Sequence, residues 1–334
     1  MDPDLELYNP LTAFLEASPY DESLGIAGAY ARSPRDCRSG GSEARDRRHR
    51  HLARSRLRCR IQRSVVSQSC HGSAYRGGVQ GGSPDLPQSR DRIEGFTRQL
   101  QEKYGVEIVG SIAELCARVD GVLLTSVDGR VHLVQAREII KAKKPVFIDK
   151  PLAATLDDAR EIARLAKEAG VPWFSTSTLR YAVATLKTPD LSGVDAWGPG
   201  PLEAHHQLDL SWYAIHEAEM LFALLGPGCE EVTRVESADA SVVSCRWKDG
   251  RIGSMRALRP SSDYGVVLFR KTAKGHTSQP TAIRPAQGEL DHELVKFFTS
   301  GVPPVPNEET LELMAFLDAA QRSKEAGGRP MRLR

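Results

Sequence analysis

From about residue 88 onward, hydrophobic positions recur with two alternating periods. Residues 89–104 and 130–143 place apolar side chains at helical spacing, whereas 121–127 and 145–148 are apolar runs of the length of a buried strand. Helices that alternate with short apolar strands are typical of a parallel sheet with crossover helices. This part of the chain is therefore predicted to form an α/β domain.

The helix predicted before Gly170 carries the clearest boundary signals. Thr155 stands at its N-cap position, with Asp158 three residues further on. Ser111 is expected to cap a shorter helix in the same way. A strand at 173–177 completes what has the pattern of half a doubly wound domain.

Beyond residue 179 the pattern changes to short alternating strands, such as 241–247 and 265–270. Three helices are expected among them, at residues 215–225, 289–298 and 308–325. The simplest architecture for this mixture is an α+β domain with a mainly antiparallel open sheet and its helices on one side.

Length and composition fit two globular domains. The 334 residues are 40% hydrophobic and 26% charged, and the formal net charge of +2 gives no reason to expect a nucleic acid partner. No window holds the roughly 18 uninterrupted apolar residues of a membrane span, and the chain does not open like a signal peptide. We expect a cytoplasmic protein without membrane contact.

The cysteines and histidines form no recognised metal or disulfide pattern. The six cysteines are scattered without a Cys-x-x-Cys pair, which fits a reducing compartment and predicts neither a zinc site nor a disulfide framework. His205, His206 and Asp209 could be drawn as a metal site, but no further ligand stands at a suitable spacing. We therefore expect a strand-surface pair of histidines there, and no metal.

Three motifs stand in a fixed order along the chain. The first is a strand, a loop and a helix start, at residues 120–127 with His132. The second is Ile-Asp-Lys-Pro-Leu at 148–152, which ends a strand. The third is a helix with a histidine near its start, at residues 212–226. Together they resemble the glucose-fructose oxidoreductase and inositol dehydrogenase family (Gfo/Idh/MocA), with its Glu-Lys-Pro motif and its active-site histidine helix. The resemblance covers roughly residue 74 to the C-terminus.

This resemblance implies a Rossmann-like, doubly wound NAD(P)-binding domain at 74–178 and a substrate and oligomerisation domain at 179–334. The cofactor would be NAD or NADP, and the partner a small-molecule sugar or polyol, with a homo-oligomer formed by face-to-face pairing of the open sheets. Asp149 would contact the ribose or orient Lys150. The implied cofactor contacts are Thr125, Ser126, Val127, His132, Asp149 and Lys150.

The implied chemistry is the oxidation of a carbinol, which removes a hydride from carbon and a proton from oxygen. By resemblance, Lys150 would face the nicotinamide and the substrate hydroxyl, and His216 would be the acid/base. Many relatives carry an aspartate four residues before that histidine, where this chain has Trp212; Tyr213 could serve as a hydroxyl partner instead. Without the resemblance, a strand-end lysine is usually solvated and a lone helical histidine is usually a core residue.

The first 73 residues do not fit this plan. A dinucleotide-binding domain needs a first strand, a glycine-rich turn and a helix whose N-terminus receives the pyrophosphate. Twelve arginines lie between Arg32 and Arg63, and Glu43–Leu57 shows neither a strand nor apolar periodicity. The first strand is therefore missing where we expect it, and the segment has the composition of a disordered one. The glycine-rich loop at 77–84 is expected to be a flexible connection.

A shift of the reading frame would account for this anomaly. When the frame is moved one nucleotide forward, codons chosen from those permitted for Glu43–Arg58 can encode Arg-Leu-Gly-Ile-Val-Gly-Thr-Asp-Thr-Ser-His-Ala-Val-Ala-Phe, which has the pattern of a strand, a glycine turn and a helix start. Our hypothesis is that this segment, to about Ser73, is an out-of-frame translation, which the nucleotide sequence decides. The competing hypothesis is a genuine basic tail that binds RNA or another polyanion, with a steep salt dependence that is lost when residues 1–73 are deleted.

The function predicted from these motifs is NAD(P)-dependent hydride transfer to or from a sugar, a polyol or a related hydroxy compound. The alternative is a catalytically degenerate sugar-binding or oligomerisation protein of the same fold, which Trp212 and the anomalous N-terminal segment would allow. Arg76, after the presumed second strand, would favour the 2′-phosphate of NADP.

Overall fold

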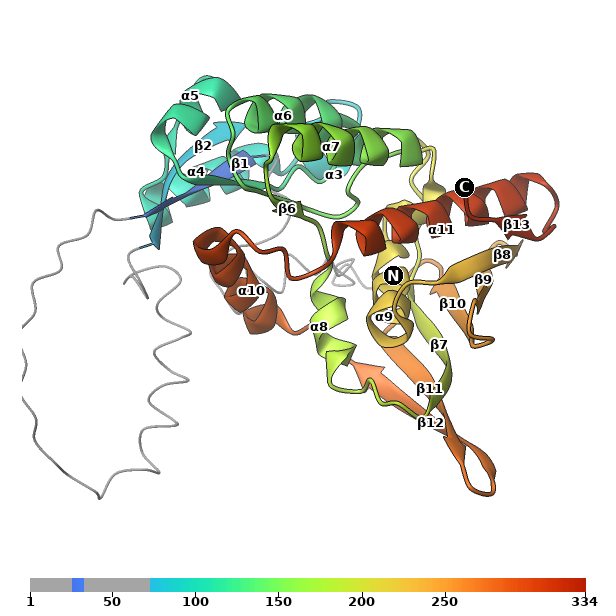
Figure 1. Ribbon diagram of the computed structural model, residues 1–334. Helices are drawn as coiled ribbons and strands as arrows, with labels where there is room; N and C mark the ends of the chain where they lie inside the picture. The colour runs from blue at the N-terminus through green and yellow to red at the C-terminus, as the bar shows by residue number, and fades with distance from the viewer. Residues whose placement is uncertain (1–25, 33–72) are drawn as a thin grey trace, which may run out of the picture.

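The computed structural model describes residues 26–32 and 73–334 and contains two sheets, each with its own helices (Figure 1). The first sheet has the strand order β3-β2-β1-β4-β5-β6. Its strands are β1 (Ile26–Arg32), β2 (Ser73–Gln80), β3 (Glu107–Ile108), β4 (Gly121–Leu124), β5 (Val146–Ile148) and β6 (Trp173–Phe174). Its helices are α3 (Pro87–Arg90), α4 (Ile93–Tyr104), α5 (Ile112–Arg118), α6 (Gly129–Lys141) and α7 (Leu156–Ala169).

The central position of this sheet is filled, contrary to the prediction that the first strand is missing. Strand β1 lies between β2 and β4 and is antiparallel to both, whereas the neighbouring pairs β2–β3, β4–β5 and β5–β6 are parallel. The strand comes from an apolar stretch, Ile-Ala-Gly-Ala-Tyr-Ala, which suits a central position because that position is covered on both faces. The proposed out-of-frame residues 43–57 lie outside the described residues.

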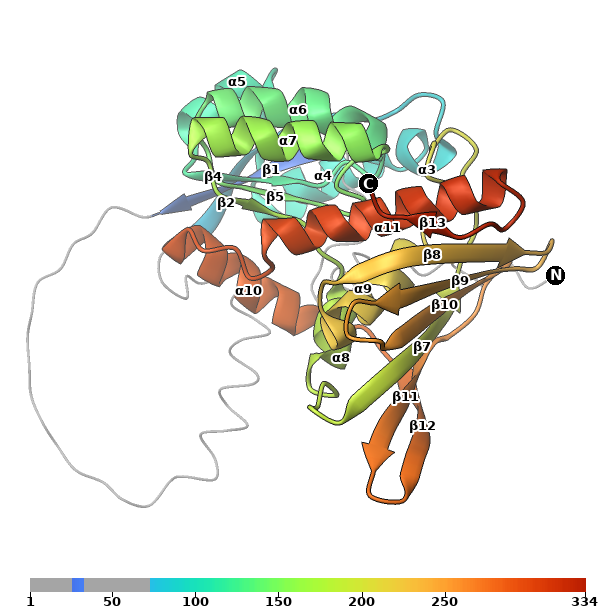
Figure 2. The ribbon, with the colours of Figure 1, turned by 45° about the vertical axis from the view of Figure 1, so that its right-hand side comes forward.

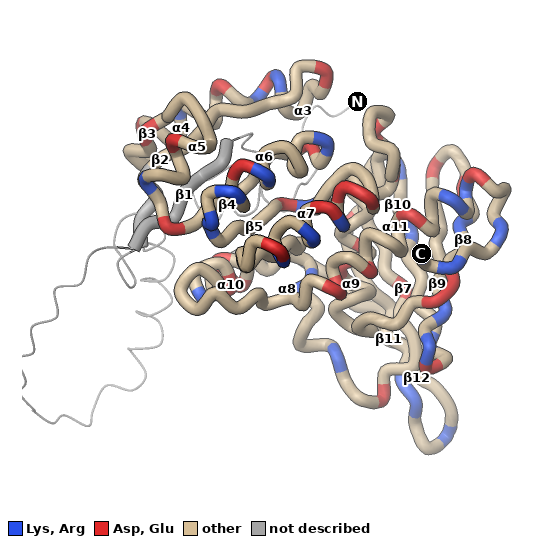
Figure 3. Tube along the Cα trace, turned by 45° about the horizontal axis from the view of Figure 1, so that its top comes forward, with Lys and Arg blue, Asp and Glu red and all other residues tan. Residues whose placement is uncertain are grey.

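Helices cover both faces of the first sheet, as expected of a doubly wound fold. Buried side chains of α5, α6 and α7 form one core with the sheet, and α4 shares a second core with β4, β5 and the later helix α10 (Gln287–Ser300). Figure 2 shows α6 and α7 on one side of the sheet and α10 on the other. Acidic and basic residues are interspersed along α6 and α7 (Figure 3), and Arg137 and Arg164 both pair with Glu161.

Most predicted boundaries in this domain hold, and the differences have local causes. Thr155 accepts a hydrogen bond from the backbone N–H of Asp158, and Ser111 accepts one from Glu114, so both predicted caps are present. The helix predicted at 89–104 is divided in two by a turn at Asp91. The predicted strands 121–127 and 173–177 end at Leu124 and Phe174, because the residues that follow form loops at the edge of the sheet.

The second sheet has seven strands in the order β12-β11-β7-β10-β9-β8-β13 and is antiparallel except for the pair β7–β10. Its strands are β7 (Leu191–Pro199), β8 (Cys229–Glu236), β9 (Ala240–Trp247), β10 (Ile252–Leu258), β11 (Tyr264–Thr272), β12 (Gly275–Ile283) and β13 (Met331–Arg332). The remaining helices are α8 (Thr178–Ala184), a 3-10 turn at Asp209–Ser211, α9 (Ile215–Leu225) and α11 (Asn307–Glu325). The predicted α+β architecture is confirmed.

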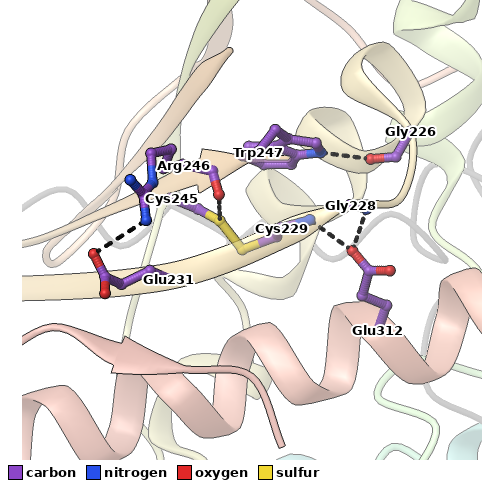
Figure 4. The surroundings of a disulfide bond; sticks show 8 residues. All are labelled: Gly226, Gly228, Cys229, Glu231, Cys245, Arg246, Trp247 and Glu312. Carbon is purple, nitrogen blue, oxygen red and sulfur yellow. Dashed lines mark hydrogen bonds and ion pairs between the residues drawn. A yellow bond between two sulfur atoms is a disulfide. The ribbon is translucent and has the colours of Figure 1, made fainter. Parts of the chain in front are cut away.

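A disulfide joins two neighbouring strands of the second sheet, so the prediction of a chain without disulfides is wrong. Cys229 on β8 and Cys245 on β9 have Cα atoms 6.0 Å apart (Figure 4). The backbone N–H of Cys229 also donates to the carboxylate of Glu312 on α11, at 2.8 Å. The sequence shows no pattern for this pair because its proximity depends on strand register, which the cysteine spacing does not reveal. Among the described residues, no helix combines the length and apolar character that crossing a bilayer requires.

Candidate active site

Lys150 lies at the carboxyl end of β5, where the sequence predicted it. Strand β5 ends at Ile148, and the next residues turn through a cis Lys150–Pro151 peptide bond. The lysine is only 5% exposed, and its Nζ lies 5.3 Å from the centre of the Tyr213 ring. At that distance the ring face attracts the ammonium group. Tyr213 belongs to the second domain, so this contact joins the two domains at the carboxyl edge of the first sheet.

His216 is the second predicted catalytic residue and lies in the first turn of α9. Its side chain is fully buried, its Nδ1 lies 2.8 Å from Ser177 Oγ, and its ring packs edge-on against Tyr213 at 5.4 Å. Burial, and then the nearby charge of Lys150, hold the pKa of His216 well below its usual value. The imidazole is therefore neutral at physiological pH. If its Nδ1–H donates to Ser177, Nε2 keeps the lone pair that a general base requires.

Asp149, which precedes the lysine, is also buried. Its backbone N–H donates to the carbonyl of Leu124 on β4, at 2.8 Å. Burial raises the pKa of its carboxyl group to about 7, although the adjacent Lys150 favours the charged form. The carboxyl group is thus close to half protonated at neutral pH. Its predicted contact with a ribose remains a prediction.

His132 connects the two loops that follow β4 and β5. Its ring is completely buried, with Nε2 2.7 Å from the carbonyl oxygen of Ser126 and Nδ1 2.9 Å from that of Pro151. Burial lowers the pKa of this imidazole despite these carbonyl contacts. The contacts fix the loop at residues 125–128 against the one at 150–152, so His132 positions the predicted cofactor-binding residues. A direct contact between this ring and a cofactor stays a prediction.

The other predicted cofactor residues follow β4 directly. Val127 is buried, Thr125 is partly exposed, and Ser126 turns its hydroxyl group inward, where it donates to Gln135 Oε1 at 2.8 Å. All three stand at the carboxyl edge of the first sheet, beside the loop that carries Lys150. Open parallel sheets bind their ligands at this edge.

Sequence reasoning did not identify a buried cluster around Asp128, which joins the two domains. Asp128 caps α6 and accepts hydrogen bonds from Ser83 and from Arg130, whose guanidinium also pairs with Asp85 at 2.8 Å. From the second domain, Nε2 of His206 lies 3.4 Å from Asp128 Oδ1. The N-cap position of Asp128 was a visible signal, but its partners come from segments that sequence spacing does not connect.

The two adjacent histidines do not form the strand-surface pair that we predicted. They lie in the loop between β7 and α9, where both ring Nδ1 atoms approach Glu203, at 2.6 Å for His205 and 2.8 Å for His206. The His206 ring is buried and packs on Trp212, 5.2 Å between ring centres. Asp209 is separate from them and pairs with Arg234 at 2.6 Å.

Two buried ion pairs fix the relative position of the helices that carry Ser177 and His216. Arg180 of α8 contacts Glu219 of α9 at 2.5 Å and Glu309 of α11 at 2.6 Å. Buried ion pairs are costly in desolvation free energy, but they require one relative placement of the helices that carry them. The first pair fixes α8 against α9, and thereby Ser177, the N-cap of α8, against His216. The capping pattern of α8 was the one sequence signal for Ser177.

Comparisons with known proteins find similarity to one family of oxidoreductases. Residues 88–177 match the family model of the Gfo/Idh/MocA oxidoreductases with an NAD-binding Rossmann fold. The chain is 40% identical over 77 residues to 1,5-anhydro-D-fructose reductase of Ensifer adhaerens, a match that covers 23% of each protein. The alignment thus spans less than a quarter of that curated relative.

Solved structures share the fold of the chain over most of its described length. A probable dehydrogenase from Thermotoga maritima is similar with a TM-score of 0.58 and 23% identity over 71% of this chain and 87% of its own. The WlbA dehydrogenase from Bordetella pertussis, solved with NADH and UDP-GlcNAcA, has a TM-score of 0.56 and 18% identity over 72% of this chain and 88% of its own. GenD2 from gentamicin A biosynthesis, solved with NAD, has a TM-score of 0.58 and 18% identity over 73% of this chain and 87% of its own.

Residues 88–177 are thus similar to the NAD-binding Rossmann domain of the Gfo/Idh/MocA oxidoreductases. The chain as a whole shares its two-sheet fold with the solved structures above.

Proposed function

We propose that the protein is an NAD(P)-dependent oxidoreductase that transfers a hydride to or from a sugar, a polyol or a related hydroxy compound. One observation carries the proposal: Lys150 from the first domain meets Tyr213 from the second, and Tyr213 packs against the buried neutral His216. A cation that polarises a hydroxyl group and a neutral base that accepts its proton are the two groups such a reaction needs.

Each residue has a distinct role in this proposal. In the oxidation direction, His216 Nε2 takes the proton of the substrate hydroxyl, and the ammonium group of Lys150 stabilises the oxygen as negative charge develops on it. Tyr213 holds Lys150 in place through its ring face. The nicotinamide, when bound, supplies the hydride acceptor. In the reverse direction the same imidazole returns the proton.

The residues present fit the nicotinamide side of the cofactor better than its pyrophosphate side. The loops after β4 and β5 lie at the carboxyl edge with Lys150, as a nicotinamide site requires. Because β1 is antiparallel to β4, its carboxyl end at Arg32 lies at the opposite edge of the sheet. A glycine turn that follows β1 at the carboxyl edge, where the pyrophosphate usually binds, is absent from the described residues. Arg76, the predicted NADP contact, has a side chain outside the described part of the structure.

This reversed strand favours a second candidate, a degenerate sugar-binding or oligomerisation protein of the same fold. Such a protein would keep the second domain and lack turnover.

The partner in either case would be a sugar or polyol, and we propose a homo-oligomer formed through the open sheet. Cytoplasmic location remains part of the proposal, although the Cys229–Cys245 disulfide is unusual for a reducing compartment.

Thermal stability with and without NAD and NADP tests the leading function. The full chain is compared with a version that carries the frame-corrected residues 43–73, because ligand binding to the native state raises the melting temperature. We expect the corrected chain to respond to one cofactor and to oxidise or reduce a polyol or 1,5-anhydro-D-fructose. If neither chain responds to either cofactor, the degenerate protein becomes the better conclusion.

A further inference from the structure

Two adjacent residues at the start of α9 bury polar atoms that have no hydrogen-bond partner in another described residue. The atoms are His216 Nε2 and both carboxylate oxygens of Glu217, and each residue is 0% exposed. A buried polar group that has lost its water and gained no partner is unfavourable, and in a native protein such groups usually mark a function or a ligand. The mechanism above uses His216 and leaves Glu217 without a role.

Strand β7 is shaped to receive the Glu217 carboxyl group. Helix α9 packs on β7, and the carboxyl lies against Gly198. A Cβ atom at residue 198 would clash with Glu217 Oε1 and would lie 2.5 Å from the ring of Tyr264. The position of the carboxyl group therefore depends on the absence of a side chain at residue 198, a close-approach role that glycine serves.

Tyr264 connects this carboxyl group to the active site. Its ring packs edge-on against the His216 imidazole, 6.1 Å between ring centres, and lies against Gly198 beside Glu217 Oε1. Glu217 thus places a carboxyl group beside the imidazole of the proposed acid/base.

We propose that Glu217 is a specificity-determining residue that hydrogen-bonds a second hydroxyl group of the substrate, next to the hydroxyl group whose proton His216 accepts. This inference rests on the proposed function and narrows its substrate class. Two consecutive residues that each present an unsatisfied polar group fit a compound with two neighbouring hydroxyl groups, a vicinal diol such as a cyclic polyol or sugar. A simple alcohol would leave the Glu217 carboxyl unsatisfied, so the site disfavours it.

The protonation state of Glu217 suits this role. Burial raises the pKa of its carboxyl group well above the usual value, with Lys150 opposing the shift. This shift favours the protonated, neutral carboxylic acid. In that form it both donates a hydrogen bond to a hydroxyl oxygen and accepts one from a hydroxyl hydrogen.

Binding of two matched probes to the full chain tests the proposal without requiring turnover. The dissociation constants of trans-1,2-cyclohexanediol and cyclohexanol are measured by ligand-observed NMR. We expect the diol to bind about tenfold more tightly, because one additional hydrogen bond in a buried site contributes roughly this much. Equal dissociation constants, or no binding of the diol, would overturn the inference.

Variants assign the preference to Glu217. Glu217→Leu should reduce the diol preference to about onefold, whereas Glu217→Gln, which keeps a donor and an acceptor, should retain most of it. Gly198→Ala should weaken the preference with Glu217 still present, because the new Cβ displaces the carboxyl group. Glu289→Leu, at an exposed position of α10, is the matched control. Far-UV circular dichroism and melting temperatures identify variants that fail to fold.

The outcomes separate this inference from the proposed function. Binding of NADH, followed by its fluorescence, reports on the cofactor site independently of the diol. If NADH binds and Glu217→Leu keeps the full diol preference, the role of Glu217 is wrong and the proposed function stands. If the diol preference depends on Glu217 while neither NADH nor NADPH binds, the oxidoreductase function fails and the diol site remains.

Discussion

The two halves of the first sheet differ in how closely they follow a dinucleotide-binding fold. On one side, β4, β5 and β6 are parallel, end at a common edge and are connected by helices with intact caps. On the other side, β1 is reversed, although it occupies the central position of the strand order. The proposed catalytic residues and the turn that binds pyrophosphate in a dinucleotide-binding fold belong to different halves, so one can be intact while the other is not.

This difference separates two requirements of the proposed function, which are the placement of the catalytic residues and the binding of the pyrophosphate. The geometry of Lys150, Tyr213 and His216 depends on β5, α8 and α9, all of which lie in the intact half or in the second domain. Pyrophosphate binding depends on the turn after the central strand. We therefore expect cofactor affinity to be more sensitive to the N-terminal segment than the catalytic geometry is.

The largest expected effect is that of Lys150→Met on turnover. Removal of the ammonium group from the reacting oxygen should lower kcat about 10³-fold, within the range of one positioned acid–base or electrostatic group. The pKa of His216 should rise at the same time, because the positive charge that lowers it is lost. The measurements are the kcat and its pH profile with the best polyol found.

Lys167→Met, on the exposed surface of α7, is the matched control for this prediction and should leave kcat unchanged. A Lys150→Met variant with a kcat close to that of the wild type would remove Lys150 from the mechanism.

The next largest effect should come from a proline in β1, which tests whether the half of the first sheet that contains the reversed strand contributes to stability. In Ala29→Pro the backbone N–H at a position paired with Val122 is lost, and a central strand does not accommodate proline. We expect the free energy of unfolding to fall by about 3 kcal/mol, measured by urea denaturation. Ala29→Ser, which keeps the N–H, should cost far less. Equal stability of both variants would show that residues 26–32 contribute little to the sheet in solution.

The sequence predicted the elements whose signals are local. Thr155, Ser111 and Gly170 mark helix ends through hydrogen bonds within a few residues, and the helix at 215–225 has the predicted bounds. Lys150 was predicted from its place at a strand end together with the family resemblance. Local capping and periodicity therefore account for most of the fold between residues 88 and 325.

The missed features all depend on contacts between distant segments. β1 comes from a stretch upstream of the expected position, and nothing local indicates its reversed direction. The Cys229–Cys245 pair requires the register of β8 and β9, and the buried His206 requires Asp128 from the other domain. Glu217 follows the predicted His216 directly, but its isolation from hydrogen-bond partners is a property of the packed interior.

The smallest expected effect, counted per pH unit, is the pH dependence of stability in the intact half. The folded-state pKa of Asp149 is about 7, above its ordinary value of 3.8, so the native state holds a proton that the unfolded state releases between these values. Stability should therefore fall as the pH rises from about 4 to 7, by at most about 1.4 kcal/mol per pH unit, and level off above pH 7. Asp149→Asn should flatten this slope in urea denaturation at pH 5, 6, 7 and 8, whereas Asp157→Asn, on the exposed start of α7, should not. An unchanged slope in Asp149→Asn would mean that Lys150 keeps Asp149 charged in the folded protein, and the pair would then act as a fixed ion pair at the edge of β5.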